Sequence, residues 1–330
     1  MEVKVEALRA YYGDCIFVTI FDDKKRFTIM IDGGTANTYS HKGAKGKTVA
    51  GPLKLKIDEL KEQGQSIDLL ILTHVDDDHI GGVKRWFEND MPTHDFVKRI
   101  WMNDDVEINV CAGLENNSAQ AASLKRTMTD MGVAFDNQMV SGREEGFDWG
   151  RIYILAPTTE QHNRISKDIA KGLENTVNDR YEMDFKALME KDYVCDSVSP
   201  ENDASMAFLL QTNDGENSLF LGDANIETIL CSLNKMESLP HPIPCKWVKL
   251  SHHGSKNNFK PEFLEMVDAE NYIISTDGTR FGHPDKEVLA WIVDKTKAFL
   301  WFNYVERADS IFTKQDKQDY TDLEERIKAF

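Results

Sequence analysis

Two histidines and three aspartates lie within six residues of this chain, and these residue types at this spacing are suited to holding metal ions. The segment 73–82 has the sequence THVDDDHIGG. Imidazoles and carboxylates packed so closely would repel one another unless a cation lay among them. A divalent metal ion supplies that cation and accepts both kinds of ligand. The ordinary alternative is an aspartate-rich turn in solvent that carries an exposed histidine.

Short polar motifs follow several other apolar segments, and this favours the metal site over the solvated turn. The motifs are at residues 32–34 (DGG), 222–224 (GDA), 252–255 (HHGS) and 282–284 (GHP). Each ends or follows a predicted strand. In layered α/β folds a site is assembled from such strand ends, which meet at one edge of a sheet.

Strand-like and helix-like patterns alternate along the chain and define the elements that position these motifs. The run DLLILT at 68–73 is apolar enough for a strand buried on both faces. The other strands are predicted at 3–8, 15–21, 26–31, 151–155, 205–212, 218–223, 247–251, 271–275 and 298–302, and the helices at 52–64, 82–89, 118–131, 285–295 and 321–329.

Residues 158–200 are polar, mixed in charge and without an apolar period, so we predict an insertion or lid there. The regular patterns on either side form two βα-rich halves. We therefore expect one domain over residues 1–330, built from two sheets packed face to face with helices outside.

The composition limits the classes of partner. The chain has 330 residues and a formal net charge of -17, which disfavours tight non-specific binding to nucleic acid or to anionic membranes. A nucleic-acid substrate held by metal ions and a local basic patch remains compatible with that charge. The five cysteines include no Cys-x-x-Cys pair, and no apolar run reaches 18 residues. The first residues carry acids early and lack a long apolar run, so we expect no secretory signal there. We expect a cytoplasmic protein that does not enter the membrane.

The sequence HVDDDHIGG resembles the signature loop of the metallo-β-lactamase superfamily, whose usual form is HxHxDH. The DGG motif at Asp32 resembles the first motif of that superfamily, and Gly222-Asp223 resembles its bridging-aspartate motif. Together with GDC at 13–15, Asn202 with Ser205, HHGSK at 252–256 and RFGHP at 280–284, the ordered set is similar to the hydrolase domain of ComEC-type competence proteins and their stand-alone relatives. The resemblance implies an αββα four-layer sandwich and a dinuclear metal-dependent hydrolase.

Two departures from the superfamily pattern affect the metal site. Asp76 stands where most members have the second histidine, a change that the ComEC-type branch shares. It exchanges a nitrogen ligand for a hard oxygen, which shifts the preference towards Mn²⁺ or Mg²⁺ while Zn²⁺ stays an option. A further histidine is usual midway along the chain, where this sequence has Ile154-Leu155-Ala156-Pro157. His162 follows that proline, and we do not expect it to be a ligand.

The resemblance assigns His74 and Asp76 to the first metal ion, and Asp78 and His79 to the second. Asp223 is expected to bridge both ions, because a carboxylate has two oxygens to share. The alternative for Asp223 is a turn cap.

Three late histidines complete the candidate set. His252 and His283 are predicted metal ligands. His253 and His283, with Asp78, are the candidates for a catalytic role. Adjacent residues at a strand end point in different directions, so His252 and His253 are expected to do different work. The alternative for each is a buried, hydrogen-bonded histidine.

Four other residues have predicted supporting roles. Ser255, Lys256 and Arg280 are candidates for holding a phosphate oxygen, with an ordinary surface position as the alternative. Asp32 is predicted to orient a ligand histidine and not to bind metal itself.

Three functions remain open. The first is a phosphodiesterase or nuclease in which a hydroxide between two divalent ions attacks a phosphoester, in a nucleic acid or a nucleotide. The second is a hydrolase of a non-phosphate small molecule such as a thioester or lactone. The third is a metal-stabilised module without catalysis in a multiprotein system. Hard-metal chemistry favours the first.

Overall fold

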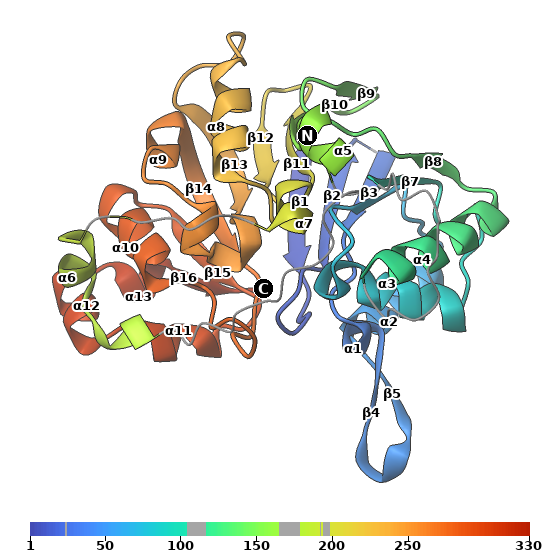
Figure 1. Ribbon diagram of the computed structural model, residues 1–330, viewed down its shortest axis with the longest axis horizontal. Helices are drawn as coiled ribbons and strands as arrows, with labels where there is room; N and C mark the ends of the chain where they lie inside the picture. Colours follow the sequence, from blue (N-terminus) through green and yellow to red (C-terminus); the bar gives the residue numbers. More distant parts are fainter. Residues whose placement is uncertain (24, 104–116, 165–178, 192, 194–198) are drawn as a thin grey trace. The chain divides into compact units, whose positions relative to one another are not determined.

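The computed structural model describes residues 1–330 except 24, 104–116, 165–178, 192 and 194–198. The chain forms two compact units, which are described one at a time. Unit 1 is Met1–Met139 with Thr159–Ile169, and unit 2 is Val140–Thr158 with Ala170–Phe330. Each unit has its own large sheet (Figure 1).

Unit 1 is built on a sheet with the strand order β1-β2-β3-β6-β7-β8 over its described residues. The first three strands are antiparallel neighbours, whereas β3, β6, β7 and β8 run parallel. The carboxyl ends of β3 and β6 therefore lie at the same edge. The strands are β1 (Glu2–Ala7), β2 (Ile16–Asp22), β3 (Lys25–Ile31), β6 (Leu69–Leu72), β7 (Arg99–Met102) and β8 (Ala134–Asp136), with a separate hairpin of β4 (Ser40–Lys42) and β5 (Thr48–Ala50).

Helices of unit 1 pack on its sheet through apolar faces. Ile57 of α2 and Trp86 of α3 are fully buried in one cluster with Leu70 and Leu72 of β6. Burial of a large apolar side chain contributes roughly 1.5–3 kcal/mol, so this face anchors α3 beside the metal-binding motif. The helices are α1 (Ala36–Tyr39), α2 (Pro52–Glu62), α3 (Asp77–Asn89), α4 (Asn117–Met131) and α5 (Thr159–Arg164), with a 3-10 turn η1 (Ala44–Gly46).

Unit 2 is built on a second sheet with the order β16-β15-β14-β13-β12-β11-β10-β9 over its described residues. From β12 to β16 the neighbours are parallel, so several strands again end at one edge. The strands are β9 (Glu144–Phe147), β10 (Gly150–Ala156), β11 (Ala207–Thr212), β12 (Asn217–Phe220), β13 (Ile243–Lys249), β14 (Val267–Ile274), β15 (Phe299–Phe302) and β16 (Ile327–Ala329).

The longer helices of unit 2 bury apolar residues against this sheet. Ile229 of α8 and Ile292 of α10 lie in one core cluster with Val248 and Tyr272. The helices are α6 (Phe185–Met189), α7 (Pro200–Asp203), α8 (Ile226–Asn234), α9 (Phe263–Met266), α10 (Lys286–Lys295), α11 (Glu306–Ile311), α12 (Lys314–Asp319) and α13 (Leu323–Arg326), with 3-10 turns η2 (Asp179–Glu182), η3 (Ser251–Gly254) and η4 (Lys256–Asn258).

The predicted α/β class is confirmed, and two helix boundaries are corrected. The helix predicted at 82–89 begins at Asp77, inside the metal-binding motif. Acidic side chains in a first turn are favoured by the partial positive charge of the helix N-terminus, so Asp77 and Asp78 belong to the helix. The last predicted helix, 321–329, is a single turn followed by β16, because Ile327–Ala329 pairs with β15.

The predicted insertion at 158–200 lies in part outside the described residues. Its described portion includes α5, η2 and α6. In unit 2, Phe185 of α6 is buried and its backbone N–H donates to Asp316 of α12 at 2.7 Å. That contact ties α6 to the C-terminal helices, while the role of the segment as a lid stays a prediction.

Among the helices that the structure describes, none has the length and apolarity that crossing a bilayer requires.

A glycine of α3 is expected to be essential for stability. A Cβ added at Gly82 would lie 1.9 Å from the carbonyl oxygen of Gly33. Glycine to alanine in an open helix stabilises by roughly 1 kcal/mol, but this clash reverses the sign. We predict that Gly82→Ala lowers the free energy of unfolding by about 1–3 kcal/mol in urea denaturation.

The matched control is Gly146→Ala, because a Cβ at Gly146 meets no atom of the described residues within 4 Å. It should stay within about 0.5 kcal/mol of the wild type. Equal effects of the two substitutions would contradict the packing argument.

Candidate metal centre

The carboxylate of Asp32 connects the ends of β3 and β6 in unit 1. Its Oδ1 accepts from the backbone N–H of Thr73 at 2.8 Å, and its Oδ2 accepts from the Thr73 hydroxyl at 2.7 Å. Oδ2 also lies 2.8 Å from Nδ1 of His79. Asp32 itself is in the left-handed region, with φ 56°, a conformation that costs a non-glycine residue about 1–2 kcal/mol. A backbone held in this state at a strand end is typical of functional sites.

These hydrogen bonds define the tautomers of two buried imidazoles. Asp32 has only acceptor atoms, so His79 presents an Nδ1–H to it. The Thr73 hydroxyl donates to Asp32 and therefore accepts from Nδ1–H of His74, 3.0 Å away. The Nε2 atoms of both rings are then the nitrogens that can coordinate a metal ion. The ring centroids of His74 and His79 lie 4.0 Å apart.

The other acidic residues of the motif lie beside these rings. Asp76 Oδ2 is 3.7 Å from His74 Nε2. A ligand atom of Asp78 lies within 4.8 Å of one on His79. Asp14, which the sequence analysis did not assign to the site, forms a further group with Asp32 and His79 whose ligand atoms are all within 4.8 Å of one another.

Close backbone contacts hold the loop against its neighbours. The N–H of Gly33 donates to the carbonyl of His79 at 2.7 Å, and the N–H of Asp14 donates to the carbonyl of Asp78 at 3.2 Å. A Cβ at Gly13 would lie 1.9 Å from that same Asp78 oxygen. The glycine beside Asp14 therefore lets the β1–β2 loop reach the start of α3.

In unit 2 the candidate residues lie after β12, β13 and β14, at the edge where these parallel strands end. Asp223 is 2 % exposed, and its N–H donates to the Ser205 hydroxyl at 2.9 Å. The buried ammonium of Lys249 lies 3.9 Å from Asp223 Oδ1 and donates to the Gly222 carbonyl at 3.2 Å. The Lys249 ammonium and the Asp223 carboxylate carry opposite charges and are thus buried together.

His252 is held by Asn258. The Asn258 amide nitrogen donates to the carbonyl of Asp223, which turns Asn258 Oδ1 toward His252 Nδ1 at 3.0 Å. His252 therefore donates through Nδ1 and directs Nε2 to Asp223 Oδ2, 3.7 Å away. The amide nitrogen of Asn202 also lies 3.1 Å from Nδ1 but, as a donor, does not accept the Nδ1–H.

His253 has a different hydrogen-bond partner from His252, as we expect for adjacent residues at a strand end. Its Nδ1–H donates to the backbone carbonyl of Ser275 at 2.8 Å, and its Nε2 lies 3.9 Å from Asp223 Oδ2. Both histidines adopt positive φ, 44° for His252 and 55° for His253, and the two rings differ in direction by 66°.

Burial lowers the pKa of His252 to about 4, although the charge of Asp223 acts in the opposite direction. His252 is therefore neutral near pH 7, which is the state that coordinates metal. His283 lies with its ring centroid 5.1 Å from that of His252, and its Nδ1 is 3.5 Å from Asp285. Burial raises the pKa of Asp285, but the hydrogen bonds from His283 and from the Lys256 backbone outweigh burial, so the pKa of Asp285 is lowered overall.

The three residues predicted to hold a phosphate lie in different surroundings. Ser255 is buried and its hydroxyl accepts from the Asn257 N–H, so it caps the turn η4. The guanidinium of Arg280 lies 4.7 Å from the centroid of the Phe281 ring. Lys256 is half-buried beside the Asp285 carboxylate that its backbone binds. Their role with a phosphate stays a prediction.

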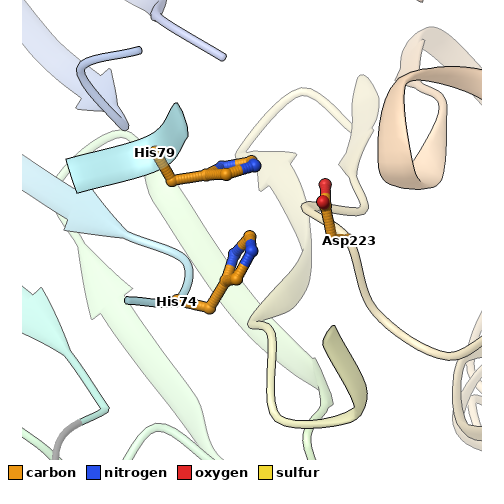
Figure 2. A group of neighbouring side chains, drawn as sticks. All are labelled: His74, His79 and Asp223. Carbon is orange, nitrogen blue, oxygen red and sulfur yellow. The ribbon is translucent and has the colours of Figure 1, made fainter. Parts of the chain in front are cut away.

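The structure thus brings the predicted residues together in two clusters. Cluster 1, in unit 1, contains His74, Asp76, Asp78 and His79 with Asp32. Cluster 2, in unit 2, contains Asp223, His252, His253 and His283. Figure 2 shows the side chains of His74 and His79 from cluster 1 and of Asp223 from cluster 2.

Sequence reasoning missed several members of these clusters. Asp14, Lys249 and Asn258 contact the candidate ligands from distant positions in the chain. A lysine inside the apolar strand WVKL was the one visible signal, because a buried charge needs a partner. His162 is buried in α5 of unit 1, and no described group that could hold a metal ion includes it.

A model of the metallo-beta-lactamase superfamily matches residues 8–94. The match includes Asp14, Asp32 and the entire loop 73–82, so the predicted resemblance is confirmed for the segment that forms cluster 1. The superfamily that this model describes consists of metal-dependent hydrolases, and His/Asp groups of the described residues could hold metal ions. Hydrolase activity of this chain stays a prediction. Membership of the ComEC-type branch stays a prediction.

Solved structures similar to this chain have low identity to it. A possible metal-dependent hydrolase from Veillonella parvula DSM 2008 is 10% identical, with a TM-score of 0.44, over 100% of this chain and 97% of its own. A long form RNase Z from yeast is 9% identical, with a TM-score of 0.38, over 83% and 37%. The metallo-beta-lactamase MIM-1 from Novosphingobium pentaromativorans is 10% identical, with a TM-score of 0.32, over 88% and 92%.

At these TM-scores the structural similarities carry no argument about function. No curated protein matches the sequence.

Asp32 should control metal affinity through His79. We predict that Asp32→Asn weakens Mn²⁺ or Zn²⁺ binding by about 10- to 100-fold in isothermal titration calorimetry, because the amide no longer fixes the ring through a charged hydrogen bond.

Asp68→Asn is the matched control. Asp68 is also an acceptor for a backbone N–H in unit 1, that of Thr28 at 2.8 Å, but it pairs with Lys98 and contacts no candidate ligand among the described residues. Its metal affinity should equal that of the wild type. A similar loss in both variants would show that Asp32 acts through general stability.

Proposed function

We propose that this protein is a two-metal phosphodiesterase that cleaves phosphodiester bonds in nucleic acid or in a nucleotide. Its proposed metal ligands are His74, Asp76, Asp78 and His79 of cluster 1 and Asp223, His252 and His283 of cluster 2. The proposal requires the two clusters to face the same pair of ions.

One observation carries the proposal. In both clusters, proposed ligand imidazoles are held through Nδ1, His79 by a carboxylate, His74 by a hydroxyl and His252 by an amide, which leaves Nε2 for the metal. Metal-binding histidines are typically oriented in this way by a partner on the other nitrogen. Histidines with a purely structural role would not need this arrangement at three positions in two clusters.

The donor set fits divalent ions. Imidazole nitrogens and carboxylate oxygens bind Mn²⁺ and Zn²⁺, and the exchange of a histidine for Asp76 favours the harder Mn²⁺ or Mg²⁺. When bound, two such ions lower the pKa of water to about 7 and stabilise the charge that develops on phosphate oxygens.

The chain's own residues have separate roles in this proposal. Asp32 keeps His79 oriented, and Lys249 keeps the Asp223 carboxylate in place from its buried position. His253, whose Nδ1–H is bound to the Ser275 carbonyl, takes up at Nε2 the proton that the attacking water releases and passes it to the leaving oxygen. Asp78 lies in the first turn of α3, where the partial positive charge of the helix N-terminus favours an acidic side chain.

Hydrolysis of bis-p-nitrophenyl phosphate with added Mn²⁺ tests the proposal. We expect turnover that disappears with EDTA and falls at least about 100-fold in Asp78→Ala, because a metal ligand is removed. Asp77→Ala is the matched control, since Asp77 is the neighbouring acid of the same helical turn and is not a proposed ligand. It should keep at least about half of the activity.

Thioester turnover without phosphodiester turnover would replace the proposal by the small-molecule hydrolase. Two metal ions per chain without hydrolysis of any generic ester would replace it by the non-catalytic module.

A further inference from the structure

The β4–β5 hairpin of unit 1 is a basic arm in an acidic protein. It extends away from α1 (Figure 1). From Gly33 to Ile57 the sequence contains no aspartate or glutamate, although the chain has 56 of them. Lys42, Lys45 and Lys47 on the hairpin are all exposed.

The hairpin lysines differ from the lysines that follow them. On α2, Lys54 pairs with Asp58, and Lys56 pairs with Glu6 and Glu59. Among the described residues, no carboxylate lies within ion-pair distance of Lys42, Lys45 or Lys47; Lys42 donates to the Thr48 hydroxyl instead. The charge of the arm is thus available to an external anion.

A cavity of about 620 Å³ lies at the base of this arm. Its polar lining includes Tyr11, Asn37, His41, Lys42, Arg85 and Asn89. Arg85 is held by the Ser40 carbonyl at 2.6 Å and, among described residues, makes no ion pair. The volume suits a group the size of a nucleotide. An aromatic ring, amides and cations are the groups that bind a base and a phosphate together.

The arm and cavity are joined to cluster 1 by α3. Arg85 is seven residues after Asp78, which places it on the same helix face at a distance of about 10 Å along the axis. The loop before α1, which leads into the hairpin, begins at Asp32. A polyanion held by metal ions at cluster 1 would therefore extend past Arg85 to the hairpin.

We propose that the hairpin and its cavity bind the backbone of single-stranded nucleic acid. Several unpaired cations spread along an extended arm fit a chain of phosphates better than one small anion. The proposal deepens the phosphodiesterase function and rests on it for its role in catalysis, but binding to the arm requires no metal ion.

Fluorescence anisotropy with a labelled 20-nucleotide oligothymidylate tests this proposal. The full chain is titrated in EDTA, so the oligonucleotide stays intact. We expect the triple substitution Lys42→Ala, Lys45→Ala and Lys47→Ala to raise Kd at least about tenfold at low salt. The slope of log K against log salt should fall by about 2, since each phosphate contact to a single strand contributes about 0.7.

The matched control removes three lysines from unit 2: Lys186→Ala, Lys297→Ala and Lys317→Ala. Each of them is ion-paired, with Asp319, Asp322 and Glu324 in turn, and the change in net charge is the same. Its affinity should stay within about twofold of the wild type. Thermal unfolding of both variants checks that they fold.

Equal affinity of the wild type and the hairpin variant would overturn the proposal, as would binding of the wild type to phosphatidylserine vesicles but not to the oligonucleotide. A wild type that binds the oligonucleotide through the hairpin but hydrolyses no phosphodiester would refute the proposed function and leave the docking site intact.

Discussion

The orientation of both imidazoles of cluster 1 depends on the buried carboxylate of Asp32. It accepts hydrogen bonds from the backbone and hydroxyl of Thr73 and binds Nδ1 of His79, so it joins the ends of β3 and β6 to the first turn of α3. A carboxylate without a counter-charge is costly to bury, and three donors offset that cost. The same contacts leave Nε2 as the coordinating atom of His79 and, through Thr73, of His74. One interaction therefore fixes both the loop and the chemistry of its imidazoles.

In unit 2, different groups orient the imidazoles and accompany the buried carboxylate. Asn258 and the Ser275 carbonyl hold His252 and His253, and Lys249 provides the buried positive charge beside Asp223. The two adjacent histidines face a common carboxylate from different directions because both adopt positive φ. Each cluster lies at the edge where parallel strands end, and in each the imidazoles are oriented through Nδ1. A dinuclear centre requires such a ligand cluster from each half of the chain. That both serve one pair of ions is the central proposal.

Much of this could be predicted from the sequence, because it depends on local patterns. The apolar run before Thr73 predicted β6, and the motifs at the strand ends predicted that Asp32, His79, Asp223 and His253 belong to one site. The structure shows Asp32 beside His79 and Asp223 beside His253. The start of α3 was missed because acidic residues that suggest a turn are also favoured at a helix N-terminus, as with Asp77. Asp14, Lys249 and Asn258 were missed because their contacts join distant parts of the chain, and no periodicity reports those. The packing of Gly82 on Gly33 is of the same kind.

The most direct test of the central proposal is the Mn²⁺ anomalous difference density of crystals of the full chain grown with excess Mn²⁺. The account predicts two peaks about 3.5–4 Å apart, each in contact with side chains of both clusters and with Asp223 between them. Peaks that contact one cluster alone, or none within reach of His74 and His79, would contradict it.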